Sequence, residues 1–318
     1  YHIVAELRDP RHVAVTRLIS MDEVELVVAG DLIARIIAQT SRHAGLSTVY
    51  TELLSYEGSE IYLAERPELI GRSFRDALFA YEFAMAIGIA SPGQPPRLNP
   101  PADATFAPGD RLIAIAGDAT DLRQTAAHDA IDEAAICVQP VVSQPSDHTL
   151  IIGWNWRVPG ILEQLNNYVA PGSTATIFAD VDGVSFVEGQ LPAQFDKLAV
   201  HIQIGNTTDR RLLDALDIVR YQQVILMCYD GIPPQQADAR TMVTLLHLRD
   251  IATKHGHSFS IVSEMLDVRN RRLAEITRPD DFIVSDQLVS LVLTQLAEVQ
   301  ELNAIFAEMF DAEGMEIY

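Results

Sequence analysis

The sequence predicts an α/β protein in which a doubly wound parallel sheet is combined with a smaller α+β unit. Three observations lead to this prediction. Short apolar runs alternate with helical patterns six times between residues 149 and 310. A β-rich stretch broken by Gly and Pro lies between residues 59 and 118. A repeat relates the first part of the chain to the last.

The repeat is long and has no gaps. Val27 to Tyr62 aligns with Ile283 to Tyr318 at a constant offset of 256 residues, and both stretches end in the pattern E-G-x-E-I-Y. Just upstream, after a two-residue slip, Ile3 to Glu6 matches Ile261 to Glu264. We therefore expect two copies of one structural unit, the second of which is the more complete.

The second copy has the pattern of a parallel sheet whose strands are joined by right-handed helical crossovers. The six predicted strands are Thr149–Gly153, Ala175–Ala179, Leu198–Ile202, Gln223–Cys228, Phe259–Ser263 and Phe282–Val284. The first predicted helix starts at Pro159. The other four cover Asp209–Leu216, Ala237–Thr253, Val268–Glu275 and Gln287–Phe310. In the third of these helices we expect Val243, Leu246 and Ile251 to face the core.

The first copy starts in the middle of the unit. Ile3–Ala5 and Val24–Val28 correspond to its fifth and sixth strands, and Leu32–Leu54 to its final helix. Strands at Ser59–Leu63, Met85–Ala90 and Arg111–Ile115 follow, with a helix at Phe74–Ala80. The predicted boundaries are residues 1–54 for the back half of the first lobe, 55–118 for a small subdomain, 119–147 for a linker and 148–318 for the second lobe. We expect this tandem arrangement to be truncated at both ends.

Charge and composition exclude several classes of protein. The 23 Lys and Arg against 44 Asp and Glu give a net charge of −21, which repels phosphate backbones, so we expect no nucleic acid partner. No apolar run reaches the length of a membrane span, which predicts that this stretch is soluble. Cys137 and Cys228 lie in apolar runs and predict buried thiols in a reducing compartment. Lysine occurs only at Lys197 and Lys254, and this arginine bias suggests a GC-rich bacterial genome.

Several motifs resemble those of a known family. Glu68–Gly71 and Pro108–Ile113 resemble the C-terminal subdomain of RCK domains, the regulators of potassium conductance. The segments Glu52–Tyr62, Asp76–Glu82 and Ser285–Ser290 are similar to the cytosolic region of the CASTOR/POLLUX (DMI1-like) ion channels. The resemblance implies a tandem RCK assembly on the cytoplasmic face of a membrane, with pore helices upstream. It also implies association with other copies, as a homotetramer in a full channel.

A nucleotide site is the first candidate at the carboxyl ends of the strands. Gly153 to Val158 occupy the place of a G-x-G-x-x-G fingerprint, but Asn155 and Val158 replace its second and third glycines. Gly153, Asn155 and Asp180 are the candidate nucleotide contacts. Because the glycines that admit a pyrophosphate are lost, we expect this turn to serve packing or an interface, and dinucleotide binding to be absent.

A calcium site is the second candidate. Asp230 and Glu264 follow the fourth and fifth strands, where calcium-activated RCK channels place regulatory carboxylates according to the resemblance. Asp182 follows the second strand, and Glu6 is the counterpart of Glu264 in the first copy. Carboxylate oxygens are the ligands that Ca²⁺ prefers. The alternative is that these are ordinary solvated carboxylates in an acidic chain.

No catalytic constellation is apparent, because the sequence contains neither a nucleophile elbow nor a convincing acid/base pair. We therefore expect no enzyme, and the resemblance to CASTOR/POLLUX channels implies the regulatory gating-ring region of a cation channel. An NAD(P)-dependent enzyme or nucleotide-sensing subunit, and a scaffold that only assembles the channel, remain alternatives. The apolar stripe of the final helix fits either a dimer face or burial against its own sheet.

Overall fold

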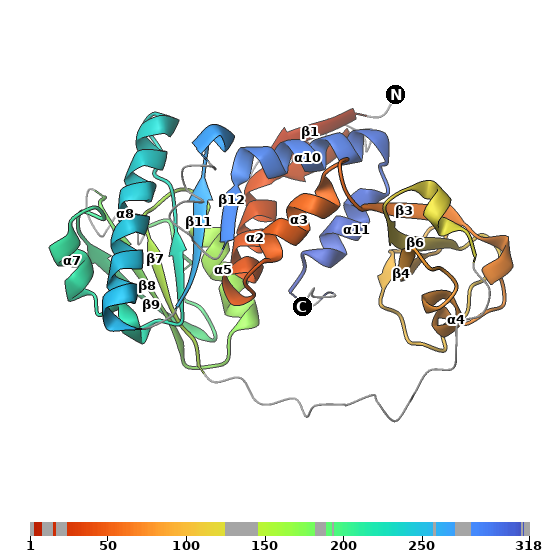
Figure 1. Ribbon diagram of the computed structural model, residues 1–318, viewed down its shortest axis with the longest axis horizontal. Coiled ribbons are helices and arrows are strands. Elements are labelled where there is room, and N and C mark those ends of the chain that lie inside the picture. The colour runs from red at the N-terminus through yellow and green to blue at the C-terminus, as the bar shows by residue number, and fades with distance from the viewer. Residues whose placement is uncertain are drawn as a thin grey trace. The chain divides into compact units, whose positions relative to one another are not determined.

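The computed structural model describes residues 3–7, 15–16, 24–124, 146–181, 189–192, 194–256, 259–270, 281–312 and 314 (Figure 1). The chain separates into two compact units, and each is described by itself. The larger unit contains residues 1–49 and 144–297, and the smaller unit contains residues 50–143 and 298–317. The two units do not coincide with the two predicted copies of the repeat. Each unit contains residues from both copies.

The centre of the larger unit is a six-stranded parallel sheet in the order β12-β11-β10-β7-β8-β9. Its strands are β7 (His148–Ile152), β8 (Ser173–Ala179), β9 (Leu198–Ile204), β10 (Gln223–Leu226), β11 (Ser260–Met265) and β12 (Asp281–Val284). The order reverses at β7, where β10 lies on one side and β8 on the other, as in a doubly wound fold. The predicted fold class and all six predicted strands are confirmed.

One face of this sheet is covered by α7 (Arg210–Ala215) and α8 (Pro234–His255). The core beneath them contains Leu150 and Phe178 from the strands and Leu248 from α8, each less than 4% exposed. The prediction for the buried face of α8 was wrong at two positions, since Val243 is 41% and Leu246 is 53% exposed. The buried face of α8 includes the polar side chains of Asp238, Thr241 and Thr244 at helical spacing, so it cannot be recognised from the pattern of apolar residues.

The opposite face is covered by α5 (Val158–Tyr168) and by α2 (Ala29–Arg42), which comes from the start of the chain. Helix α2 packs against α5 and against β10, β11 and β12. Its Ile33, Ile36 and Ile37 are completely buried. Gly30 of α2 lies against the indole ring of Trp156, where a Cβ atom would collide with the ring. A helix from residues 29–42 therefore completes the core of the sheet formed by residues 148–284.

Polar contacts fasten α2 and the loop after it to that sheet. Gln39 Nε2 donates to the hydroxyl of Tyr168 at 2.8 Å, and Arg42 pairs with Asp147 at 2.9 Å. Asp281, the first residue of β12, accepts from the backbone N–H groups of Gly45 at 2.6 Å and Ser47 at 3.1 Å. A buried carboxylate needs such donors to offset its desolvation, so these contacts also fix the position of the loop.

The predicted helix Gln287–Phe310 is wrong as a single element. The chain forms α10 (Ser285–Glu298) and α11 (Leu302–Met309), with a break at residues 299–301. The counterpart Leu32–Leu54 also breaks, into α2 and α3 (Leu46–Leu54), at Gly45, whose φ of +96° favours glycine. No Gly or Pro marks the break before α11, where backbone N–H groups bond back three residues to Val299 and Gln300.

The remaining elements of the larger unit are short. Strands β1 (Ile3–Leu7) and β2 (Val24–Val28) form a separate parallel pair, and η5 (Ile218–Arg220) and η6 (Val268–Asn270) are single 3₁₀ turns. Residues 271–275 of the helix predicted at Val268–Glu275 lie outside the described part of the chain. Among the described residues, no helix has both the length and the apolar content needed to cross a bilayer.

The smaller unit contains an antiparallel sheet in the order β3-β6-β4-β5, which confirms the predicted α+β character. Its elements are β3 (Glu60–Glu65), η2 (Pro67–Leu69), α4 (Phe74–Leu78), β4 (Ala84–Ala90), β5 (Arg97–Leu98), β6 (Arg111–Ala116) and η3 (Ala119–Leu122). Phe74 and Leu112 are buried in its core, and a capping box between Ser73 and Asp76 starts α4. Residues 119–122, inside the predicted linker, pack into this core through Leu122, and residues 125–145 lie outside the described residues.

The turn between β7 and α5 yields a prediction about stability. Gly153 has a φ of +98°, and a Cβ atom there would collide with the backbone carbonyl of Met227. Gly172 has a similar φ of +90° but open space around it. We expect Gly172→Ala to lose about 1–2 kcal/mol of unfolding free energy from its left-handed conformation alone. Gly153→Ala should lose clearly more, about 3 kcal/mol or above, because backbone must also move.

Urea unfolding of the two glycine variants measures this difference directly. Equal losses for Gly153→Ala and Gly172→Ala would contradict the close approach between the turn and Met227.

Candidate functional site at the carboxyl edge of the sheet

The candidate site lies where β7, β10, β11 and β12 end and where α5 and α10 begin. The β7–α5 turn brings Asn155 and Arg157 to this edge, and Ser285 is the first residue of α10. Asn155 and Ser285 are 1% and 0% exposed, respectively. The edge is therefore filled by side chains of the protein itself.

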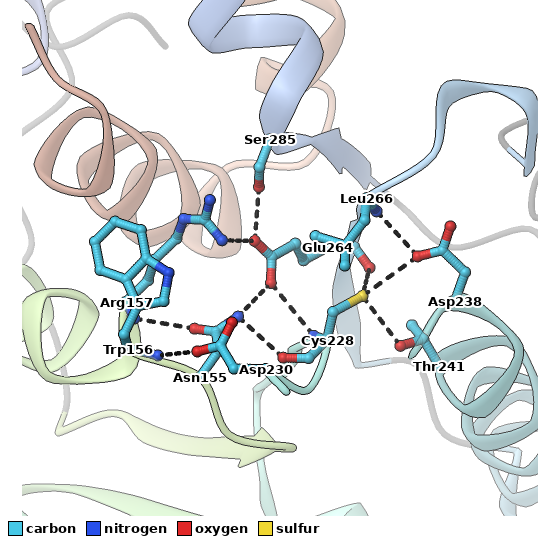
Figure 2. Close-up of polar contacts among 10 residues, drawn as sticks. All are labelled: Asn155, Trp156, Arg157, Cys228, Asp230, Asp238, Thr241, Glu264, Leu266 and Ser285. Atoms are coloured by element: carbon cyan, nitrogen blue, oxygen red, sulfur yellow. Dashed lines mark hydrogen bonds and ion pairs between the residues drawn. The ribbon is translucent and has the colours of Figure 1, made fainter. Parts of the chain in front are cut away.

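The centre of the site is the carboxylate of Glu264, which is buried and bonded through both oxygens (Figure 2). Oε1 accepts from Arg157 Nη1 at 3.0 Å and from the Ser285 hydroxyl at 2.6 Å. Oε2 accepts from Asn155 Nδ2 at 2.7 Å and from the backbone N–H of Cys228 at 3.3 Å. One carboxylate thus joins β11 to three other segments of the chain, the turn at residues 155–157, Cys228 and Ser285.

Burial and these donors act on Glu264 in opposite directions. Removal from water raises the pKa of Glu264 above its usual range, and this is the larger effect. The Arg157 guanidinium and the hydrogen-bond donors lower the same pKa. Arg157 is itself nine-tenths buried, and its Nε has no hydrogen-bond partner among the residues that the structure describes. The ion pair is therefore an internal part of the fold in which each charge depends on the other.

A second carboxylate, Asp230, lies at the exposed rim of the site. Its Oδ2 accepts from the backbone N–H of Trp156 at 2.8 Å, two residues before the start of α5 (Figure 2). The positive end of the α5 dipole favours a negative charge at this position. The Trp156 ring stacks under the Arg157 guanidinium at 4.7 Å and also packs against Gly30 of α2. Asp230 is thus connected through Trp156 both to the buried ion pair and to α2.

Cys228 and Asp238 organise the far side of the site. The Cys228 thiol is buried, and burial together with the Glu264 charge raises its pKa well above its usual value, so it is an unreactive thiol. Asp238 of α8 is completely buried and accepts from the backbone N–H groups of Leu266 and Asp267 at 2.9 and 3.1 Å. These bonds hold the loop that follows β11.

The structure brings only some of the predicted site residues together. Asn155 and Glu264 are in direct contact, and Asp230 reaches them through Trp156. Asp180 lies apart from this network and pairs with Arg240 at 2.7 Å. Of the remaining candidates, Gly153 lies in the turn directly after β7, Glu6 is exposed on β1, and Asp182 lies outside the described residues.

No group of three or more His, Cys, Asp or Glu side chains able to hold a metal ion occurs in the part of the chain that the structure describes. Sequence reasoning missed Arg157 and Ser285, although both contact Glu264. The available signal was their position, because Arg157 lies two residues after Asn155 and Ser285 directly follows the sixth predicted strand.

Comparison with solved structures defines the class of fold. The human SLO3 gating ring matches 96% of this chain and 66% of its own chain with a TM-score of 0.67 at 14% sequence identity. The chain therefore has the α/β fold of RCK gating-ring domains.

Comparison of sequences identifies the relatives within that class. Residues 30–132 match the family model described as "Castor and Pollux, part of voltage-gated ion channel". The chain is 29% identical to the probable ion channel CASTOR of Oryza sativa subsp. japonica over 99% of its length, and 28% identical to the ion channel CASTOR of Lotus japonicus over 100%. The chain is therefore similar to CASTOR ion channels over nearly its whole length, and the resemblance that the sequence motifs predicted is confirmed.

The match covers only part of those relatives. The chain spans 39% of the rice protein and 41% of the Lotus protein. Both are plant proteins, so this comparison does not support the bacterial source that the arginine bias suggested.

The buried ion pair yields a second prediction. We expect Arg157→Met to lose about 3–5 kcal/mol of unfolding free energy near neutral pH, because it leaves the Glu264 carboxylate buried without its cation. The pKa of Glu264 is already higher in the folded state than in the unfolded state. Its contribution to the free energy of unfolding therefore falls as the pH rises from the unfolded-state pKa through the folded-state pKa. Without Arg157 the pKa of Glu264 rises further. The loss of unfolding free energy in Arg157→Met, relative to the wild type, should therefore be larger at about pH 8 than at about pH 5.

Urea unfolding at the two pH values measures this, and Arg157→Met/Glu264→Gln should recover part of the loss. Arg211→Gln, which removes an exposed arginine of α7, is the matched control and should change stability little. A deficit that is independent of pH, with no recovery in the double variant, would contradict the internal ion pair.

Proposed function

We propose that this chain is the cytosolic regulatory, gating-ring region of a cation channel related to CASTOR and POLLUX. The role is regulatory and not catalytic. The observation that carries the proposal is the Glu264 network, which ties the ends of three strands to α5 and α10 at the ligand-binding edge of a doubly wound sheet. A ligand that changes this edge acts on several elements together.

The path from the edge to α2 supplies a route for coupling. A ligand at Asp230 competes for the carboxylate that holds the Trp156 N–H, and Trp156 packs against Gly30 of α2. A shift of the turn would therefore change the fit between α5 and α2. To control a gate, the ligand needs to favour one arrangement over another by a few kcal/mol.

Calcium is the ligand that we propose. Asp230 is exposed and acidic and lies four residues after β10, and oxygen ligands suit Ca²⁺. Glu264 has both oxygens in hydrogen bonds, so it contributes only if Arg157 releases it. We infer that Asp230 is the primary calcium ligand and that Glu264 responds by exchanging partners.

The proposal includes a tandem arrangement and a homotetrameric assembly attached to an upstream pore domain. Similarity to ion channels supports the pore domain, and likeness to a gating ring supports assembly with other copies. Two observations support the tandem arrangement. Helices α2 and α10 each have 14 residues, and each directly follows the second strand of a parallel pair, β1–β2 or β11–β12.

The alternative of a nucleotide-binding subunit or oxidoreductase has weaker support. Asn155 is buried at the position where a fingerprint glycine admits a pyrophosphate, and its amide is bonded to Glu264 and to the Cys228 carbonyl. Trp154 is also buried in this turn. Micromolar binding of NADH or ATP to the protein would favour this alternative.

Calcium titration of the chain tests the proposal. We expect isothermal titration calorimetry to detect Ca²⁺ binding, and Asp230→Asn to weaken it by about tenfold or more, because the variant keeps the acceptor for Trp156 but loses the charge. Asp214→Asn, which neutralises an exposed carboxylate on α7, is the control and should bind as the wild type does.

In the full-length channel, Asp230→Asn/Glu264→Gln should lose Ca²⁺-dependent current while retaining current in the absence of calcium. Undetectable Ca²⁺ binding at millimolar concentration, or equal binding by Asp230→Asn and Asp214→Asn, would contradict the calcium proposal and leave a scaffold role.

A further inference from the structure

A second polar cluster lies on the same sheet, toward the amino-terminal ends of its strands. A pocket of about 300 Å³ is lined by His148, Thr174, Thr176, His201, Arg220 and Tyr221. His148 is the first residue of β7, and Arg220 and Tyr221 come just before β10. This pocket is therefore distinct from the carboxyl edge at which Glu264 lies.

The composition of this pocket differs from that of the chain. The net charge of the protein is −21, yet none of the six lining residues is acidic. Arg220 carries a permanent positive charge, and His148 and His201 are the only other side chains in the lining that can become cationic. Such a lining attracts anions, which the rest of the surface repels.

Arg220 is held in place by a directional chain of hydrogen bonds. Its Nη2 donates to the Tyr221 hydroxyl at 2.6 Å, and its guanidinium lies 4.8 Å from the centre of that ring. The Tyr221 hydroxyl donates in turn to Thr176 Oγ1 at 3.0 Å. Thr176 is only 3% exposed and lines the pocket. Its own hydroxyl hydrogen has no acceptor among the residues that the structure describes, so the chain ends in a buried donor.

The other side of the pocket offers a second donor. His148 Nδ1 and Thr174 Oγ1 are 2.8 Å apart. If the threonine donates, the neutral imidazole carries its hydrogen on Nε2, and if the imidazole donates, the threonine hydrogen is free. Each tautomer leaves one donor for an acceptor in the pocket. Arg220 supplies charge to the same space, and His201 lies exposed on the neighbouring strand.

We propose that this pocket binds a phosphate-type oxyanion. The ligand accepts hydrogen bonds from Thr176, from the His148–Thr174 pair and from Arg220, and its charge is balanced by the guanidinium. The source is a free phosphate compound and not a lipid headgroup, because a chain of charge −21 is repelled by an anionic membrane surface. The inference depends neither on calcium nor on a role in a channel.

Titration of the 318-residue chain with inorganic phosphate at constant ionic strength tests the proposal by calorimetry. We expect saturable binding by the wild type. Arg220→Gln and Thr176→Val should each weaken it, the former by about tenfold or more, because a charge-assisted hydrogen bond is lost. Arg211→Gln removes a charge from an 89%-exposed arginine of α7 outside the pocket and should bind phosphate as the wild type does.

Two results would overturn the proposal. One is the absence of binding at millimolar phosphate, and the other is binding that Arg220→Gln and Arg211→Gln reduce equally. Sedimentation with phosphatidylcholine vesicles, with or without phosphatidylinositol 4,5-bisphosphate, distinguishes the source. Pelleting that requires the phosphoinositide and Arg220 would keep the oxyanion site but overturn the free phosphate as its ligand. Circular dichroism of each variant confirms that the fold is retained.

Discussion

The larger unit depends on one packing constraint, the burial of α2 against a sheet that the chain forms much later. Three fully buried isoleucines of this helix cover strands β10 to β12. Burying one such side chain is worth about 1.5–3 kcal/mol, so this surface is a large part of the stability of the unit. Hydrophobic burial has no preferred direction. The hydrogen bonds to Asp281 and the close fit of Gly30 against Trp156 fix the position of α2 on the sheet. The candidate site inherits its geometry from the same packing, because Trp156 belongs to both.

Charge is distributed unevenly over a very acidic molecule. At the carboxyl edge, a buried carboxylate is compensated by a guanidinium and three further donors, whereas Asp230 remains at the rim in contact with water. Toward the amino-terminal ends of the strands, the pocket that contains Arg220 is lined by no acidic side chain. The two ends of the strands therefore carry side-chain clusters of different charge, one with carboxylates and one without any acidic group. In each case a tyrosine or tryptophan links the charged side chain to the packed core.

The sequence was sufficient to locate the six strands along the chain, because periodicity and turns reflect local preferences. It failed where tertiary contacts decide the outcome. The buried face of α8 includes Asp238 and Thr241, which are satisfied by Cys228 and by the loop after β11, so no apolar pattern marks it. The end of α10 carries no breaking residue. Glu264 was recognised as a strand-end carboxylate, but its burial and its partner Arg157 follow only from the approach of α5 to β11.

The origin of α2 near the start of the chain also has a consequence for biosynthesis. The helix leaves the ribosome long before the strands that cover it. At roughly 5–20 residues per second, the stretch from Arg42 to Asp281 takes on the order of tens of seconds to synthesise. During that interval strands β10 to β12 are not yet available to Ile33, Ile36 and Ile37 of the helix. Completion of this core is therefore necessarily a late event in the synthesis of the protein.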